Sequence, residues 1–299
     1  MNMCTKEIKD NPPGFRHPSE HNLQHKEIKI KTKDNLTLYG WFIFKERNPN
    51  LPTFIYFHEN AGNIGFRLHF SRYLVEKIKS NVLVIGYRGY GYSEGEPTEQ
   101  GIMLDAEAIL NYVYDEKSEL IDYIDVNNLY IFGRSLGGAV AMYICDKLKP
   151  KIKGLVLENT FTSMPDMVDQ IFPFLKHVKN ILLTNHWPSK DRIKNLEYPI
   201  YFISSERDEL VPFAHMEELF TLATKAAFKN KFIIKGGTHN ESWQRCQHDY
   251  EQKLKEFLEK CSNKEDNMED IEDELNNAIN YGSSINREED SYLLGKKDI

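Results

Sequence analysis

The sequence predicts an α/β protein with a mostly parallel central β-sheet and helices on both of its faces. Two patterns support this prediction. Six short, almost continuously apolar runs alternate with helical stretches, as expected for strands that are buried on both faces of a sheet. Ahead of them, residues 28–44 alternate apolar and polar side chains around a turn at Asp34-Asn35, which predicts an antiparallel amino-terminal hairpin.

The predicted elements follow one another in a regular order. Residues 1–24 form a polar arm with three prolines, which we expect to be loosely held. Helices are expected over residues 66–79, 98–117 and 139–149. The core strands are expected at residues 53–57, 81–86, 129–133, 155–158, 200–204 and 232–234.

One connection is much longer than the others. Residues 160–198 separate two core strands and carry several large apolar side chains, so we expect a short helical cap there and not a flexible loop. Residues 262–299 are rich in Asp, Glu and Asn and poor in large apolar side chains, which predicts a disordered acidic tail. A single α/β domain is therefore expected over residues 25–261, with the cap inserted into it.

Composition and charge exclude several classes of protein. The 299-residue chain is 40% hydrophobic and 28% charged, which is typical of a globular domain. No apolar run approaches the roughly 20 residues of a membrane-spanning helix, and residues 1–20 show neither a secretory signal nor an anchor. Residues 263–299 contain 11 acidic and 4 basic side chains and so account for the whole net charge of −7. The neutral remainder disfavours nucleic-acid binding.

The cysteines and glycine-rich segments favour neither a metal nor a cofactor. Cys4, Cys145, Cys246 and Cys261 lie far apart, with no C-x-x-C pair, which predicts reduced thiols, no zinc site and a cytoplasmic location. The chain has no G-x-x-x-x-G-K-[ST] sequence, so no nucleotide cofactor is expected.

The most informative motif is Gly133-Arg134-Ser135-Leu136-Gly137, which lies between a predicted strand and a predicted helix. G-x-S-x-G in that setting is typical of a nucleophile elbow, a sharp turn that exposes a strained serine above the sheet. The alternative is a glycine-rich helix start that only packs closely on the sheet.

A serine alcohol becomes a good nucleophile when a base takes its proton and an acid orients that base. Asp208 lies just after the predicted strand 200–204, where an orienting acid is expected; Glu206 and Glu209 are rivals in the same loop. His239 follows the last predicted strand and a pair of glycines, and is the candidate base.

Acyl transfer also requires hydrogen-bond donors for the developing oxyanion. The loop after residues 53–57 reads His58-Glu59-Asn60-Ala61-Gly62-Asn63. We expect the backbone amides of Asn60 and Leu136 to form the oxyanion hole, and His58 to fix the loop by hydrogen bonding.

With these motifs in this order, residues 26–261 resemble the alpha/beta-hydrolase superfamily of serine hydrolases, in the branch typified by alpha/beta-hydrolase domain-containing protein 13. The likeness is carried by residues 57–65, 87–97, 133–139, 158–163 and 237–240. The resemblance implies the alpha/beta-hydrolase fold, with Ser135 as nucleophile, Asp208 as acid, His239 as base and residues 160–198 as the cap that shapes an acyl pocket. It also implies an acyl ester or thioester substrate, either a small molecule, a lipid or an acylated protein.

Two features depart from that branch. Glu59 replaces a glycine in the oxyanion loop, and a carboxylate there would oppose the oxyanion unless its side chain turns to solvent. Relatives often begin with a membrane anchor that the residues here lack, which leaves peripheral membrane contact open. The alternatives to an esterase are therefore a catalytically weak or inactive scaffold that binds partners, supported by Glu59, and a serine peptidase.

Overall fold

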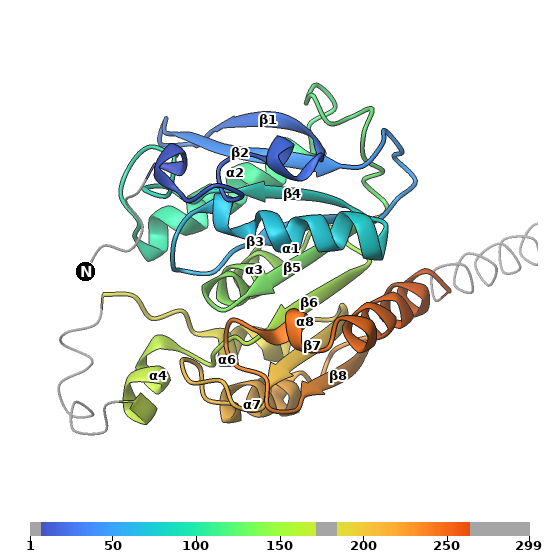
Figure 1. Ribbon diagram of the computed structural model, residues 1–299. Helices are drawn as coiled ribbons and strands as arrows, with labels where there is room; N and C mark the ends of the chain where they lie inside the picture. The colour runs from blue at the N-terminus through green and yellow to red at the C-terminus, as the bar shows by residue number, and fades with distance from the viewer. Residues whose placement is uncertain (1–6, 172–183, 264–299) are drawn as a thin grey trace, which may run out of the picture. The chain divides into compact units, whose positions relative to one another are not determined.

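The computed structural model describes residues 7–171 and 184–263, so the predicted tail from residue 264 onward and the middle of the predicted cap lie outside the described residues. Its centre is an eight-stranded sheet with the strand order β1-β2-β4-β3-β5-β6-β7-β8 (Figure 1). The strands are β1 (Gln24–Lys31), β2 (Thr37–Phe44), β3 (Thr53–Phe57), β4 (Asn81–Ile85), β5 (Leu129–Arg134), β6 (Gly154–Glu158), β7 (Pro199–Ser205) and β8 (Phe228–Ile234).

The sheet is mostly parallel, as predicted. Strands β3 to β8 all run in the same direction, whereas β2 pairs antiparallel with both β1 and β4. Every residue of β3, β4, β5 and β6 is buried, because helices cover both faces of the central strands. That double coverage is the reason why these strands have continuous apolar sequences.

The two edge strands have a different pattern. In β1, exposed and buried residues alternate near its end, and in β8 only Ile234 is buried while the other residues are half-buried or exposed. Lys229 and Lys231 occupy β8, and charged residues of this kind are common on edge strands because they discourage pairing with other chains. They also explain why the sequence predicted only the last three residues of this seven-residue strand.

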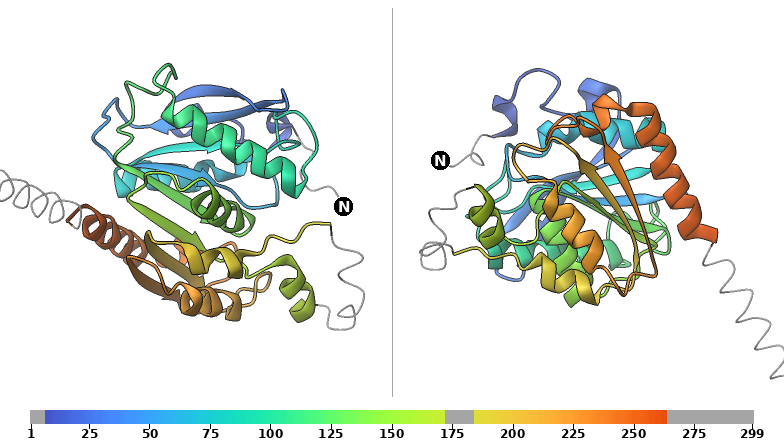
Figure 2. Two further views of the ribbon diagram at one scale, coloured as in Figure 1. Left: turned by 180° about the vertical axis from the view of Figure 1, so that it is seen from behind. Right: turned by 90° about the horizontal axis from the view of Figure 1, so that it is seen from below.

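Helices form a layer on each side of the sheet (Figures 1 and 2). Helix α1 (Leu68–Tyr73) and helix α8 (Ser242–Arg245) lie together on one face, where the rings of Tyr73 and Trp243 have centroids 4.8 Å apart. Helices α2 (Glu99–Tyr114) and α3 (Leu136–Lys147) contact each other on the other face, with α6 (Ser189–Arg192) and α7 (Ala214–Leu222) beside them. Within residues 7–171 and 184–263, the remaining helical segments are η1 (Ile8–Asp10), η2 (Pro18–His21), η3 (Ile64–Arg67), η4 (Leu74–Ile78), α4 (Met164–Ile171), η6 (Ile193–Asn195) and residues 247–263.

Two local predictions differ from the structure. The helix expected over residues 66–79 is a series of a 3₁₀ turn (η3), α1 and a π-helical turn (η4). The arm expected to be loosely held is packed from residue 7 onward, because Ile8 is 1% exposed and Asn11 exchanges two side-chain hydrogen bonds with Asn63 (2.8 and 3.0 Å). The second difference arises from contacts between the arm and a distant part of the chain.

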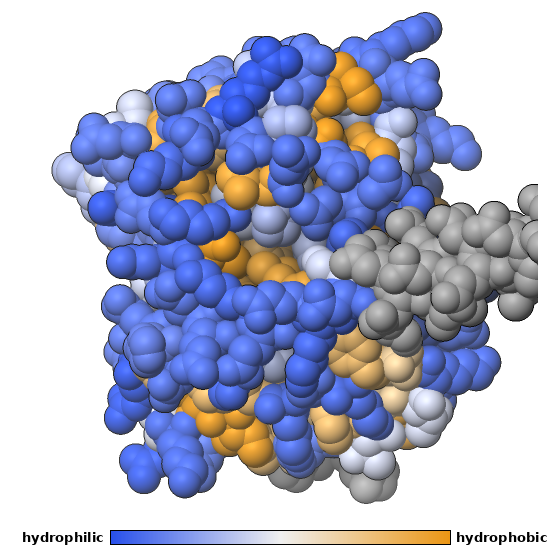
Figure 3. Space-filling view, turned by 90° about the vertical axis from the view of Figure 1, so that its right-hand side faces the viewer, coloured by the Kyte–Doolittle hydropathy of each residue, from blue (hydrophilic) through white to orange (hydrophobic). Residues whose placement is uncertain are grey.

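The surface is largely hydrophilic on the side that Figure 3 shows, and its apolar residues form separate small groups there. The described residues contain no helix that is both long enough and apolar enough to span a bilayer.

The parallel strands all end at one edge of the sheet. The loops after β3, β5, β7 and β8 lie at this edge and carry every residue that the sequence singled out for chemistry.

Candidate active site

Ser135 lies at a sharp turn between β5 and α3. Its backbone angles are φ 53° and ψ −120°, a conformation that is unfavourable for a residue with a side chain. Neighbouring groups hold it there: its N–H donates to the carbonyl of Glu158 (2.9 Å), and its own carbonyl accepts from Thr160 Oγ1 (2.7 Å). Strain fixed in this way is the local geometry of a nucleophile elbow.

The glycines of the motif are required by close packing. A Cβ at Gly137 would stand 1.8 Å from the carbonyl oxygen of Phe57, and one at Gly133 would stand 2.5 Å from the carbonyl oxygen of Gly137. The helix start therefore packs closely on the sheet, and this packing is one of the reasons why the serine is held in its strained conformation.

His239 and Asp208 form a buried pair. His239 Nδ1 lies 2.7 Å from Asp208 Oδ2, and the two side chains are 5% and 1% exposed. The other oxygen of Asp208 accepts hydrogen bonds from the amides of Leu210 (2.9 Å) and Val211 (2.7 Å). These contacts fix the carboxylate so that it orients the imidazole.

The two rival acids bind backbone groups of the same region. Glu206 accepts from the amide of Gly236 (2.9 Å), and Glu209 accepts from the amide of His239 itself (3.1 Å). Both carboxylates therefore fix the loop that carries His239, and the contact with the imidazole ring belongs to Asp208.

From the sequence, the charge of Glu59 was expected to oppose an oxyanion unless the side chain turned to solvent. In the structure the side chain does not turn to solvent. It is 5% exposed and is neutralised by ion pairs with Arg67 (3.1 Å) and Arg134 (3.0 Å), and it accepts a hydrogen bond from the hydroxyl of Tyr56 (2.9 Å). Burial by itself would raise the pKa of the Glu59 carboxyl, but the charges of Arg67 and Arg134 outweigh burial and lower its pKa to about 2. The carboxylate is ionised but compensated, which removes the objection based on its charge.

His58 is a structural residue in the same loop. It is fully buried, its Nδ1 lies 2.7 Å from the carbonyl oxygen of Glu59, and its ring stacks on Tyr87 with centroids 4.2 Å apart. Burial, reinforced by the positive charge of Arg67, lowers the pKa of His58 to about 4, so the ring is neutral near pH 7.

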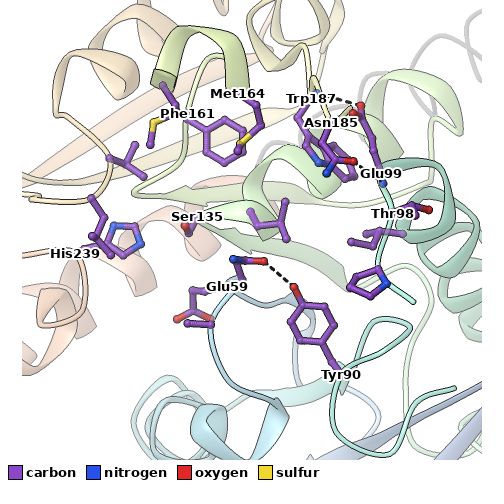
Figure 4. Close-up of a pocket in the computed structure, with 18 of the residues that line it drawn as sticks. Glu59, Tyr90, Thr98, Glu99, Ser135, Phe161, Met164, Asn185, Trp187 and His239 are labelled. Atoms are coloured by element: carbon purple, nitrogen blue, oxygen red, sulfur yellow. Dashed lines mark hydrogen bonds between the residues drawn. The ribbon is translucent and has the colours of Figure 1, made fainter. Parts of the chain in front are cut away.

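Ser135, His239, Asn60 and Leu136 all line one pocket, a cavity of about 490 Å³. Ser135 and His239 lie at the same end of it in Figure 4. Leu136 is the first residue of α3, where backbone N–H groups have no carbonyl of the helix to bind. Asn60 is fixed from the side, because its Oδ1 accepts a hydrogen bond from Tyr90 (2.7 Å), a residue whose role the sequence did not predict.

The rest of the pocket is mainly apolar, and part of its wall comes from the cap. Phe161, Met164 and Trp187 lie above Ser135 in Figure 4. Other apolar residues that line it are Ala61, Pro97, Ile102, Met167, Leu210 and Val211.

Glu99 joins the cap to the core of the domain. Its carboxylate accepts hydrogen bonds from the amides of His186 and Trp187 (3.0 Å for Trp187), and its own N–H donates to Asn185 Oδ1 (3.0 Å; Figure 4). Glu99 begins α2, where a negative charge is also favoured by the helix dipole. Nothing in the local sequence indicated this contact, because the two segments are more than 80 residues apart.

Comparison with known proteins agrees with this architecture. Residues 52–180 match a family model described as alpha/beta hydrolase fold. The chain is 36% identical to the alpha/beta hydrolase domain-containing protein WAV2 of Arabidopsis thaliana, over 81% of this chain and 81% of WAV2. The chain belongs to the alpha/beta hydrolase family.

Two further proteins resemble this alpha/beta hydrolase, one in sequence and one in structure. Protein bem46 of Schizosaccharomyces pombe is also 36% identical, over 83% of this chain and 82% of bem46. Among solved structures, the Pyrococcus furiosus esterase Pf2001 superposes with a TM-score of 0.67 at 20% identity, covering 86% of this chain and 98% of the esterase. At that identity the likeness concerns the fold alone.

Within residues 7–171 and 184–263 of this alpha/beta hydrolase, no three His, Cys, Asp or Glu side chains lie close enough together to bind a metal ion.

Arg134 is a residue of the site that the sequence did not reveal. Its position in the motif was treated as unspecified, yet its guanidinium contacts Glu59, Glu158 and the carbonyl of His239. The one sequence signal was its place, because an arginine that directly follows an apolar run and precedes the serine is a charge at the end of a core strand.

Proposed function

We propose that this protein is a serine hydrolase that cleaves acyl esters or thioesters through Ser135, His239 and Asp208. The observation that carries the proposal is the buried Asp208–His239 pair, which lies on the same pocket as a serine in a strained elbow. Membership of the alpha/beta hydrolase family adds support, because such pairs serve acyl transfer in that fold.

In the proposed mechanism, Ser135 attacks the acyl carbonyl while His239 Nε2 takes the hydroxyl proton. Asp208 holds Nδ1 of the ring and stabilises the imidazolium that forms. The amides of Leu136 and Asn60 bind the oxyanion, and His239 then gives its proton to the leaving alcohol or thiol. Water activated by the same histidine cleaves the acyl-enzyme and restores Ser135.

The pocket supports an apolar acyl group as the substrate class. Its aromatic and thioether side chains offer an apolar surface next to Ser135, and its charged residues Glu59, Arg67 and Glu99 are engaged in pairs or in hydrogen bonds to the backbone. Both small acyl esters and acylated proteins would present such a group. The scaffold alternative loses its main support, because the charge of Glu59 is compensated.

A fluorophosphonate probe tests the proposal, since it reacts with an activated serine. The folded protein is expected to be labelled, and Ser135→Ala is expected to abolish labelling and to lower ester hydrolysis by about 10⁶-fold. Ser19→Ala, which changes an exposed serine that does not line the pocket, is the matched control and should leave both unchanged. Labelling that persists in Ser135→Ala, or its absence from the folded wild type, would refute the proposal.

The substrate class is tested separately with a panel of short and long acyl chains, each as an oxygen ester, a thioester and an amide. The expected result is turnover of esters and thioesters with little turnover of amides. Preferred cleavage of the amides would identify a peptidase.

A further inference from the structure

We propose that Arg134 is a positioning residue that holds the loop carrying His239 in place relative to Ser135. Asn159 is a second positioning residue for the same loop. This inference rests on the hydrolase function proposed above. Arg134 does not line the pocket and would not touch the substrate. Its effect would be transmitted through the backbone of His239.

Arg134 contacts three different parts of the site. Its Nη1 lies 3.0 Å from Glu59 Oε1 in the oxyanion loop, and its Nε lies 3.3 Å from Glu158 Oε1 at the end of β6. Its Nη2 donates a hydrogen bond to the carbonyl of His239 (2.5 Å). One guanidinium thus joins the oxyanion loop, the elbow and the histidine loop.

The sheet brings these groups together. Strands β3, β5 and β6 are neighbours, and Glu59, Arg134 and Glu158 lie at or just beyond their carboxyl ends. Arg134 is paired with Glu158 in the register of β5 and β6. The Arg134 side chain is 5% exposed, so these contacts are hardly screened by water.

The partners of Arg134 are themselves fixed. Glu158 is fully buried and accepts hydrogen bonds from the hydroxyls of Ser242 and Tyr250 (2.5 Å for Tyr250). Asn159 donates from Nδ2 to the same carbonyl of His239 (3.2 Å), and its Oδ1 accepts from the amide of Ser205 (2.8 Å). Arg134 and Asn159 therefore both donate to the backbone carbonyl of His239. Each of the two side chains is itself held by a residue of an adjacent strand.

The shape of the side chain matters as much as its charge. A planar guanidinium presents five N–H donors in fixed directions, whereas the ammonium of lysine is a compact point charge. Lysine at position 134 would keep the charge balance of the buried cluster, but it could not reach Glu59, Glu158 and the carbonyl of His239 together. Arg134→Lys therefore removes the contacts that position the loop of His239 while it keeps the positive charge.

The test compares Arg134→Lys with the wild type in a steady-state esterase assay. We expect kcat to fall by about 10² while KM changes by less than about threefold, because a displacement of about 1 Å between reacting groups costs that much. The acid limb of the pH–rate profile should also shift, because it reports the imidazole that the loop carries. Arg88→Lys is the control, since Arg88 is an equally buried, ion-paired arginine away from the pocket; it should lower the unfolding midpoint without changing the kinetic constants.

A kcat within twofold of the wild type, with an unshifted pH profile, would overturn the proposal while leaving the hydrolase function intact. If Arg134→Lys does not fold, Asn159→Gly decides, because Asn159 has a φ of 45° that glycine accepts readily. It should also reduce kcat and shift the acid limb, and unchanged values would overturn the proposal. Loss of the serine function itself would be seen separately, as a wild type that the fluorophosphonate does not label.

Discussion

The charge of a single residue has to be judged with its neighbours, and Glu59 is the example here. A carboxylate beside a developing oxyanion opposes catalysis when it stands alone, but two guanidinium groups surround this one. Its partner Arg134 adjoins Ser135, so the compensation is built into the elbow itself. The pair is a buried ion pair, and breaking it from either side would leave an uncompensated charge.

His58 allows a prediction of pH dependence at the residue scale. Its folded pKa of about 4 lies below the value of the unfolded chain, about 6.5, so the unfolded state binds a proton first as the pH falls. The free energy of unfolding should therefore decrease by about 2 kcal/mol from this residue between about pH 7 and pH 5. Urea unfolding at several pH values measures it.

His58→Gln is the variant that assigns this effect. It should reduce the slope of stability against pH over that range, even though the variant is less stable throughout. An identical slope in the variant would show that other histidines cause the pH dependence.

Individual site residues differed in how far the sequence predicted them. Ser135 and His239 stand in local motifs, and Asp208 could be preferred to its rivals because an apolar Leu-Val-Pro segment follows it and leads into a helix. Arg134 could not be interpreted in the same way, because its partners lie between 24 and 105 residues away and nothing local marks them. Chemistry within a motif is visible in sequence, whereas the contacts that hold motifs together depend on the tertiary structure.

At the scale of elements, the cap is fixed to α2 through Glu99. Within the described parts of the cap, Met164 N–H donates to the carbonyl of His186 (2.9 Å), and Lys190 N–H donates to that of Thr162 (2.9 Å). Glu99 then binds the same segment from the core, next to Trp187, which is 2% exposed and lines the pocket.

Glu99→Ala should therefore loosen the pocket wall. The variant loses hydrogen bonds between a charged carboxylate and two backbone amides, so kcat/KM for apolar acyl esters should fall by roughly tenfold or more. The emission of Trp187 should change as well, because its surroundings become less rigid. Glu96→Ala removes an exposed carboxylate three residues away and serves as the control. Equal effects of both changes would contradict the role given to Glu99.

The secondary structure could be predicted where burial dictates the pattern. The central strands were predicted correctly because both of their faces are covered. Most of β8 was not predicted, because this edge strand carries lysines. The 3₁₀, α and π turns between residues 64 and 78 were predicted as one helix, since all three have similar apolar spacing.

At the scale of the whole molecule, Arg88 joins the hairpin to the parallel part of the sheet. Its guanidinium contacts Asp105 in α2 (2.8 Å) and Asp34 in the turn between β1 and β2 (2.8 Å). Asp105 is fully buried, and it also accepts a hydrogen bond from the amide of Arg88 (2.7 Å). Three segments that are distant in sequence are thus connected through one side chain.

Asp105→Leu should consequently reduce the free energy of unfolding by about 3 kcal/mol, because it leaves a buried guanidinium without its buried carboxylate partner. Asp34→Asn is the matched change at the exposed end of the same cluster, and should cost much less, because solvent screens an exposed ion pair. Urea unfolding of both variants at neutral pH checks the difference, and similar losses would argue against it.

The fold class and its antiparallel hairpin were predictable for the molecule as a whole, because alternation of strands and helices determines them. The boundary of the domain was harder to place. The sequence before residue 25 looks polar and irregular, yet Ile8 has its contacts near Gly91, and Asn11 has its partner in the loop that follows β3. Polarity alone does not distinguish a segment that packs from one that does not.

The pairing of Asn11 with Asn63 has a practical consequence for anyone who prepares this protein. A recombinant version trimmed to begin at residue 25 would delete the partner of a side chain that shapes the oxyanion loop. A shortened protein that still folds would then have low activity for a reason unrelated to the proposed catalytic groups.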